Sequence, residues 1–364
     1  MPDGSIAPSP HIAPTYARAP IAFERGEGCF LFSTDGQRYL DFGSGIAVNA
    51  LGHSHPALVA ALQDQAAKLW HTSNLYEIPH QRDLAQALTA NTFADLVFFA
   101  NSGAEALEGC IKAARRFHHL RGNSQKYRII GANSAFHGRT MATISAGNNA
   151  KHLEGFGPRV DGFDHVAYNN LNELRAAITE ETAAVLVEPI QGEGGIAPAD
   201  LSYLIALRET CDEYGILLIF DEVQCGVGRT GRLFAHQWAD GAADPDLMAV
   251  AKGIGGGFPL GCFMGTTEAM AGISAGMHGT TYGGNPLASR VGCAVMDVMT
   301  QPGFLDRVYQ ASNRLWDEMG AVVEANPHVY RLRRGAGLMQ GVMIADPHTC
   351  GEVVARLRDE HHLL

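Results

Sequence analysis

Two charged residues each follow a short apolar run, and together they are suited to cofactor chemistry. Asp221 follows Ile216–Phe220, and Lys252 follows Leu247–Ala251. Continuous apolar runs of this length are typical of strands buried on both faces of a parallel sheet. Because ligands bind beyond the carboxyl ends of such strands, we expect both charges to project into one crevice.

A lysine and a carboxylate in one crevice indicate a cofactor that acts as an electron sink. Burial removes charge from a lysine, and a neutral amine is what Schiff-base formation requires. A fixed carboxylate can hold a pyridinium nitrogen protonated. Lys252 and Asp221 therefore favour pyridoxal 5'-phosphate as the cofactor, whereas an ion pair closing two strand ends is the alternative.

Lysine is scarce, which narrows the choice of nucleophile. The chain has five lysines. Lys68 and Lys112 lie in amphipathic helical patterns, and Lys126 and Lys151 lie in polar loops, so we expect these four to be solvated. Only Lys252 follows an apolar run and precedes glycines.

Composition excludes several classes of protein. The 364 residues are 46% hydrophobic and 18% charged, with no run long enough to span a membrane. The net charge of −11 is dispersed, which disfavours nucleic acid as a partner. Residues 1–20 lack the basic start and apolar stretch of a signal peptide, and seven scattered cysteines suit a reducing compartment. We expect a cytoplasmic protein without a membrane partner.

Expected strands and helices alternate from about residue 57 to 265, which is typical of an α/β layout with a mostly parallel sheet. A hairpin over 23–42, turning at Asp35-Gly36, precedes this region. After it we expect helices over Pro286–Val298 and Phe304–Ala325 and a strand pair within Arg331–Ile344. Within the alternating region, strands are expected at 95–100, 128–132 and 183–187, and helices at 56–70, 103–119 and 203–214.

The segment Asn101–Glu108 has the pattern of an anion site. Ser102 and Glu105 form a capping-box pattern at the start of a helix. Backbone N–H groups of Gly103 and Ala104, aided by the helix dipole, are expected to seat a phosphate. An ordinary capped helix is the alternative, because capping boxes are common.

Two other segments carry residues suited to ligand binding. In Asn133–Thr140, an aromatic side chain could lie flat on a pyridine ring, and Arg139 could bind a substrate carboxylate through two hydrogen bonds. His53 and His55 have no carboxylate or cysteine at ligand spacing. We interpret these histidines as loop-packing residues and expect no metal site.

The ordered segments resemble the class III aminotransferases of the type I pyridoxal-phosphate fold, particularly their acetylornithine branch. The resemblance extends over nearly the whole chain from about Pro20. It rests on Leu-Gly-His-Ser-His-Pro56, Leu-Trp-His-Thr-Ser-Asn74, Phe-Ala-Asn-Ser-Gly-Ala-Glu-Ala106, Ala-Phe-His-Gly-Arg-Thr140, Val-Glu-Pro-Ile-Gln-Gly-Glu-Gly-Gly195, Phe-Asp-Glu-Val-Gln-Cys-Gly-Val-Gly-Arg-Thr-Gly231, Lys252 with its glycines, and His-Gly-Thr-Thr-Tyr-Gly-Gly-Asn-Pro286. The resemblance implies a large cofactor-binding domain at 57–299 and a smaller domain formed by 1–56 and 300–364.

The resemblance also implies how the chain holds the cofactor. Lys252 forms the Schiff base and shuttles the proton, and Asp221 pairs with the pyridinium nitrogen. Gln224 contacts the ring hydroxyl, and Phe136 stacks on the ring. The phosphate is seated by three residues, the last of them from the second subunit of a homodimer: Gly103, Ala104 and Thr281.

For the substrate, the resemblance implies that Arg139 holds a carboxylate and that Thr280 reaches across the dimer interface. Glu193 acts as a gate that lets one pocket accept an ω-amino substrate and glutamate. The implied reaction is ping-pong transfer of the terminal amine of N2-acetyl-L-ornithine to 2-oxoglutarate, giving L-glutamate, in arginine biosynthesis. The alternatives are ornithine, succinyl-diaminopimelate or succinylornithine as the amine donor, an aminomutase, and a non-catalytic cofactor-binding dimer.

The chain departs from the family pattern at its C-terminal end. It stops at Leu364, whereas the resemblance implies a further segment with the arginine that partners the glutamate matching Glu193. We therefore expect a truncated small domain, or another group in place of that arginine. Arg331, Arg333 and Arg334 lack a matching motif, and we expect them on a solvated strand end.

Overall fold

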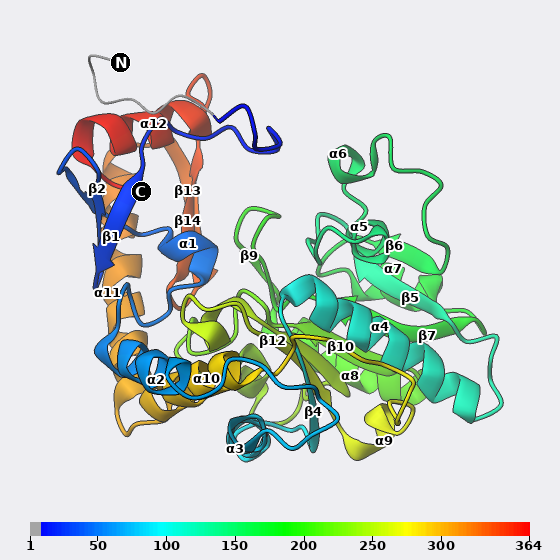
Figure 1. Ribbon diagram of the computed structural model, residues 1–364. Coiled ribbons are helices and arrows are strands. Elements are labelled where there is room, and N and C mark those ends of the chain that lie inside the picture. Colours follow the sequence, from blue (N-terminus) through cyan, green and yellow to red (C-terminus); the bar gives the residue numbers. More distant parts are fainter. Residues whose placement is uncertain (1–8) are drawn as a thin grey trace.

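A seven-stranded sheet forms the centre of the computed structural model, which describes residues 9–364 (Figure 1). The start of the N-terminal segment, residues 1–8, lies outside the described residues. In spatial order the strands are β4 (Leu96–Ala100), β12 (Gly261–Gly265), β11 (Leu247–Val250), β10 (Leu217–Asp221), β7 (Thr182–Val187), β5 (Arg128–Ala132) and β6 (Phe163–Val166). In this sheet β12 alone points in the direction opposite to the other six strands, which confirms the expected mostly parallel arrangement.

Burial of both sheet faces explains the continuous apolar runs. All five residues of β10 are buried. Leu218 and Phe220 belong to one core cluster, and Leu217 and Ile219 belong to another, because successive side chains of a strand point to opposite faces. The end of β10 therefore lies between two layers of helices.

Helix α4 (Gly103–Leu120) covers one face of the sheet, while α8 (Leu201–Tyr214) and α10 (Pro286–Met299) pack into the core of the other (Figure 1). The remaining helices of this part of the chain are α2 (Pro56–Ala66), α3 (Pro79–Thr89), α5 (Met141–Gly147), α6 (Ala150–Leu153), α7 (Leu171–Ala177), α9 (Thr267–Met270), η1 (Ala235–Ala239) and η2 (Lys252–Gly255). No helix among residues 9–364 has the length and apolar character needed to cross a membrane.

Residues 40–42, near the N-terminal end of the described chain, lie beside the last residues of the chain (Figure 1). The amide of Leu40 donates to the carbonyl of His362 at 2.8 Å, and that of Phe42 donates to Leu364 at 3.0 Å. The elements of this region are β1 (Phe23–Glu27), β2 (Phe30–Ser33), β3 (Arg38–Leu40), α1 (Ser44–Ala47), α11 (Phe304–Ala325), β13 (Tyr330–Ala336), β14 (Met339–Ile344) and α12 (Cys350–His361). The domain boundaries at residues 56 and 299 stay a prediction.

The expected hairpin over 23–42 is a three-stranded meander. Asp35 and Gly36 do lie in the turn between β2 and β3, but a second turn at Gly28 and Cys29 separates β1 from β2. That turn lacks the Asn-Gly or Asp-Gly signal that marks tight hairpins in sequence. The helix expected over 56–70 is also shorter, because α2 ends at Ala66.

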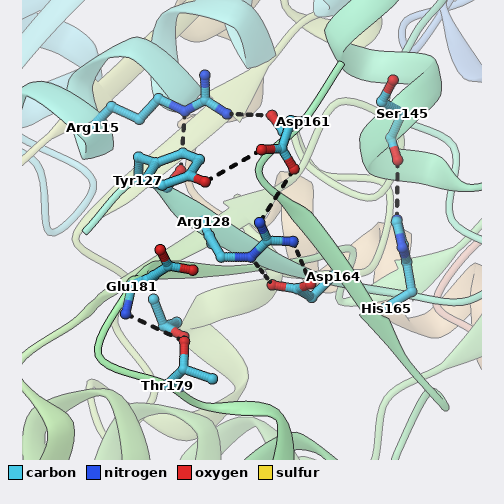
Figure 2. A network of polar contacts seen from close by, with 10 residues as sticks. Arg115, Tyr127, Arg128, Ser145, Asp161, Asp164, His165, Thr179 and Glu181 are labelled. Carbon is cyan, nitrogen blue, oxygen red and sulfur yellow. Dashed lines mark hydrogen bonds and ion pairs between the residues drawn. The ribbon is translucent and has the colours of Figure 1, made fainter. Parts of the chain in front are cut away.

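A polar network closes the outer edge of the sheet, where β5 pairs with β6 (Figure 2). Arg128 donates two hydrogen bonds to Asp164, at 2.8 and 2.7 Å, and a third to Asp161 at 3.2 Å. Tyr127 and Arg115 also bind the segment around Asp161. The basic side chains of this edge are therefore occupied by the chain itself and do not form a free cationic surface.

Candidate active site

A cavity of about 350 Å³ lies where the ends of β10 and β11 meet the start of α4. Its size is typical of a small-molecule site. Seven of the ten residues singled out from the sequence line it: Gly103, Ala104, Phe136, Glu193, Asp221, Gln224 and Lys252. Arg139 lies beside the cavity, with its guanidinium carbon 5.4 Å from the centre of the Phe136 ring.

Lys252 begins η2, directly after β11 and Ala251. Its backbone has a φ of 50°, a left-handed conformation that is uncommon for a residue with a side chain. Burial lowers the pKa of the Lys252 ammonium, although the charges of Asp221, Glu193 and Glu188 oppose this shift. A lowered pKa raises the fraction of neutral amine available as a nucleophile.

Asp221 is the last residue of β10 and is only 4% exposed. One carboxylate oxygen accepts the amide of Val223 at 3.0 Å, and the other lies 2.8 Å from Nδ1 of His137. These contacts hold the carboxylate in the wall of the cavity. Strand β10, which ends in Asp221, pairs with β11, which leads to Lys252.

His137 is a cavity residue to which the sequence analysis assigned no role. It is buried, and its Nε2 has no partner among the described residues. Burial lowers the pKa of His137, but the hydrogen bond to Asp221 and the charges of Asp221 and Glu188 outweigh burial and raise it above the ordinary value. The sequence feature that could have identified His137 is its position in the segment Ala-Phe-His-Gly-Arg-Thr140, which follows β5.

Glu188 is a second buried carboxyl group that the sequence analysis left without a role. It follows β7, is 5% exposed, and accepts the amides of Phe136 at 2.9 Å and Gly192 at 3.3 Å. Burial raises the pKa of Glu188. The charge of His137 opposes this shift, whereas the charge of Asp221 increases it. Glu188 thereby ties the loop carrying Phe136 to the loop carrying Glu193.

The start of α4 has free backbone donors in residues that line the cavity. Ser102 Oγ accepts the amide of Glu105 at 3.3 Å, as the capping pattern predicts. The carboxylate of Glu105 instead accepts the amide of Asn101 at 2.7 Å, one residue earlier than in a capping box. Within the described chain, the amides of Gly103 and Ala104 have no hydrogen-bond partner, which suits an anion at this helix terminus.

Thr280 and Thr281 do not line this cavity. They lie on a second cavity together with His71, Asn74 and Gln81. The sequence prediction placed both threonines in the site of the other subunit, and the single chain leaves that prediction untested.

Arg333 and Arg334 are half-buried, so their expected place on a solvated strand end is wrong. Arg333 donates to the carbonyl of Trp316 and lies over its ring, because α11 packs on β13. Arg331, by contrast, is exposed and pairs with Asp346.

One of the two loop histidines contacts an acidic residue: Nε2 of His53 lies 2.7 Å from Oδ2 of Asp41. Among residues 9–364, no group of three acidic, histidine or cysteine side chains is placed to hold a metal.

Comparison with known proteins decides the family. The family model described as aminotransferase class-III matches residues 11–361. The chain belongs to the class III aminotransferases. This class III aminotransferase is 57% identical to the acetylornithine aminotransferase of Mesorhizobium japonicum and 56% identical to that of Agrobacterium fabrum. Both alignments cover 96% of the chain and 86% of the relative.

Solved structures agree with this assignment. The ornithine aminotransferase of Toxoplasma gondii is similar, with a TM-score of 0.93 at 30% identity over 97% of this chain and 84% of that one. The N-acetylornithine aminotransferase of Stenotrophomonas maltophilia has a TM-score of 0.82 at 34% identity, over 96% and 87% of the two chains. The fold is therefore the type I fold of pyridoxal-phosphate aminotransferases.

Class III aminotransferases use pyridoxal phosphate, and the cavity fits this cofactor. The unpartnered amides at the start of α4 suit its phosphate, and the buried Asp221 carboxylate suits a protonated ring nitrogen. Gly138, with a φ of 130°, lets the chain pass close to Ala104, whose Cβ would lie 2.8 Å from a Cβ added at position 138. Only glycine at position 138 therefore allows this loop to lie so close to the start of α4.

Proposed function

We propose that this chain is an acetylornithine aminotransferase, which transfers the terminal amine of N2-acetyl-L-ornithine to 2-oxoglutarate in the cytoplasm. The observation that carries the proposal is the 57% identity to the Mesorhizobium japonicum enzyme of that name over 96% of the chain. The cavity supports it, because a lysine of lowered pKa and a buried carboxylate line the same space.

Pyridoxal phosphate, when bound, supplies a ring that stabilises negative charge on the carbon bearing the substrate amine. Lys252 Nζ would bind the cofactor aldehyde and then move the proton between the substrate carbon and the cofactor. Asp221 would hold a proton on the ring nitrogen, and His137 would keep the Asp221 carboxylate oriented through their 2.8 Å contact.

The remaining cavity residues would position the cofactor. The amides of Gly103 and Ala104 would bind the phosphate together with Thr281 of a second subunit. The ring of Phe136 would lie on the pyridine face, and Gln224 would bind the ring hydroxyl.

Substrate recognition is assigned to Arg139, Glu193 and Thr280 of the second subunit. Glu193 lines the cavity and Arg139 lies beside it, and both are exposed, so a substrate carboxylate and amine can reach them from solvent. An arginine binds a carboxylate through two parallel hydrogen bonds, which suits 2-oxoglutarate and glutamate.

We also propose a homodimer, because two neighbouring segments expose several large apolar side chains. These segments, residues 69–76 and 277–282, meet where the ring centres of His71 and Tyr282 are 5.2 Å apart. The exposed side chains are Leu69, Trp70, Leu75, Tyr76, Met277 and Tyr282. Contiguous exposed apolar surface is typical of protein–protein interfaces.

The test is a comparison of amine donors with 2-oxoglutarate as acceptor. N-acetylornithine should give the highest kcat/KM, and ornithine, the donor suggested by the 0.93 TM-score to the Toxoplasma enzyme, should give a lower value. Succinylornithine and succinyl-diaminopimelate complete the comparison. A higher kcat/KM for ornithine than for N-acetylornithine would assign the chain to the second function.

A further inference from the structure

Asn74, the last residue of the segment Leu-Trp-His-Thr-Ser-Asn74, has no part in the proposed reaction, yet its side chain makes long-range contacts. Asn74 Nδ2 donates to the carbonyl of Thr280 at 3.3 Å and to that of Gly283 at 3.1 Å. The two carbonyls lie 206 and 209 residues further along the chain. Asn74 therefore bridges both sides of the turn that carries Thr281.

Gln81, in α3, extends this contact. Its Nε2 donates to Oδ1 of Asn74 at 2.8 Å and to the carbonyl of Gly284 at 3.3 Å. Ser289 Oγ, from α10, donates to the same carbonyl of Gly284 at 3.0 Å. Two side-chain amides and one hydroxyl thus bind the three carbonyls of one short segment, which we call the 280–284 turn.

The 280–284 turn also packs against the central sheet. A Cβ added at Gly283 would lie 2.4 Å from the carbonyl oxygen of Phe99 in β4, so only glycine allows this approach. The Thr280 hydroxyl accepts the amide of Gly283 at 3.0 Å. The turn therefore packs on β4 and is also bound by the side-chain amides of Asn74 and Gln81.

Thr281 lies within this turn. Its side chain is exposed and forms no hydrogen bond within residues 9–364, although the backbone on both sides of it is fixed. It lies on the face that exposes Trp70, Leu75 and Tyr282. A hydroxyl held rigidly on an interface, without a partner in its own chain, is suited to a ligand in the neighbouring copy.

We infer that Asn74 and Gln81 are positioning residues that hold the 280–284 turn in the shape in which Thr281 reaches the cofactor phosphate of the partner subunit. This inference rests on the proposed function, because it takes the cofactor and the dimer from it. The two amides do not touch the cofactor. They hold the backbone of the turn in one conformation. Thr281 therefore loses less conformational entropy when the cofactor phosphate binds.

The first test separates the phosphate from the rest of the cofactor. Apo-protein is titrated with pyridoxal phosphate and with pyridoxal, which lacks the phosphate, and the Kd of each is read from visible absorbance. Asn74→Ala should raise the Kd of pyridoxal phosphate by about ten-fold, as expected for losing one or two neutral hydrogen bonds. The Kd of pyridoxal should not change.

Two further variants make this result specific. Gln81→Glu keeps the side-chain size but replaces the donor with an acceptor, so it should weaken pyridoxal phosphate binding in the same selective way. Asn91→Ala is the matched control, because the Asn91 amide also donates to a backbone carbonyl, that of Ala87 at 2.8 Å, but far from the turn. Equal losses for both aldehydes, or no loss for either, in Asn74→Ala and Gln81→Glu would overturn the inference.

The second test asks which subunit the turn serves. Mixed dimers combine an Asn74→Ala chain with a Lys252→Ala chain, and the covalent visible band reports only the site that keeps Lys252. That site receives its turn from the Lys252→Ala chain, in which Asn74 is intact. Its Kd for pyridoxal phosphate should therefore equal the wild-type value. A Kd equal to that of the Asn74→Ala homodimer would show that the turn serves its own chain and would overturn the inference.

Failure of the proposed function gives a different result. Neither test contains an amine donor, so a wild-type protein that binds pyridoxal phosphate without converting N-acetylornithine would contradict only the proposed reaction. A wild-type protein that stays monomeric with pyridoxal phosphate bound would contradict the dimer and, with it, the inference.

Discussion

Three buried ionisable side chains, carried by β10 and by the segments that follow β5 and β7, line the cavity. Asp221, His137 and Glu188 are each at most 5% exposed. Buried charges are stable only when they are paired, and removing one member of a buried pair typically costs about 3–5 kcal/mol. The 2.8 Å contact between His137 and Asp221 therefore supports folding as well as the orientation of the carboxylate.

His137 should make the stability of the apo-protein depend on pH. Its folded pKa is raised, so the stabilisation is complete below its ordinary pKa of about 6.5 and is lost as pH rises through the folded value. The free energy of unfolding of the wild type should exceed that of His137→Asn by the largest amount below about pH 6.5. This difference should become smaller as the pH rises. Urea unfolding of both proteins across this range measures it.

The control is His119→Asn, because His119 is exposed at the end of α4. Its difference from wild type should be small at every pH. A difference between wild type and His137→Asn that stays constant, or grows, with increasing pH would mean that the pair does not carry the predicted charge.

Among the elements, the loop after β7 determines where Gln224 and Glu193 lie. A Cβ added at Gly192 would lie 1.6 Å from Oε1 of Gln224, which is shorter than any non-bonded contact. The amide of the same glycine also donates to Glu188. Any side chain at position 192 must therefore displace Gln224 or the loop.

Gly192→Ala should raise the Kd of pyridoxal phosphate by about ten-fold, because it moves the side chain assigned to the ring hydroxyl and disturbs a hydrogen bond to a buried carboxylate. Absorbance titration of the apo-protein measures the change. Gly351→Ala is the control, since nothing lies within 4 Å of a Cβ added there. Similar Kd values for both variants would exclude this role for the loop.

The sequence predicted the elements that carry strong local patterns. The run before Asp221 is apolar throughout because the strand is buried on both faces, and α11 matches its expected bounds of Phe304–Ala325. The strand β12, at Gly261–Gly265, was not predicted, because five residues beginning and ending in glycine give no clear strand signal. Its antiparallel place between β4 and β11 depends on pairing with β4, which is distant in sequence.

The site was predictable where one residue type is rare or follows a strand. Lys252 was identified because lysine is scarce and the preceding run is apolar. The pairing of His137 with Asp221 joins residues 84 apart in the chain, and no local pattern reports such a contact. The same holds for Asn74 and Gly283, whose contact depends on how α3 and α10 pack together.

At the scale of the whole molecule, the proposed dimer predicts both the mass of the protein in solution and its cofactor affinity. The wild-type chain of 38.9 kDa should sediment at twice that mass. Leu75→Glu, at a side chain that is 88% exposed in the single chain, should shift the protein towards the monomer, because burying a charge in an interface is unfavourable. It should also raise the Kd of pyridoxal phosphate, since the monomer lacks Thr281 from the partner.

Analytical ultracentrifugation and absorbance titration measure both effects. Leu120→Glu is the control, because Leu120 is 51% exposed at the end of α4, away from residues 69–76. A Leu75→Glu protein that remains dimeric with unchanged cofactor affinity would place the interface on another face.

A single half-reaction tests the proposed activity. Protein loaded with pyridoxal phosphate receives N-acetylornithine without any keto acid, and visible absorbance is followed. The cofactor band should disappear and return when 2-oxoglutarate is added, in wild type and in Lys68→Ala, whose lysine is exposed. Lys252→Ala should slow the conversion by about 10³-fold, within the range expected for losing a general acid–base group. A wild-type band that persists with N-acetylornithine, or that returns without 2-oxoglutarate, would contradict transamination by this chain.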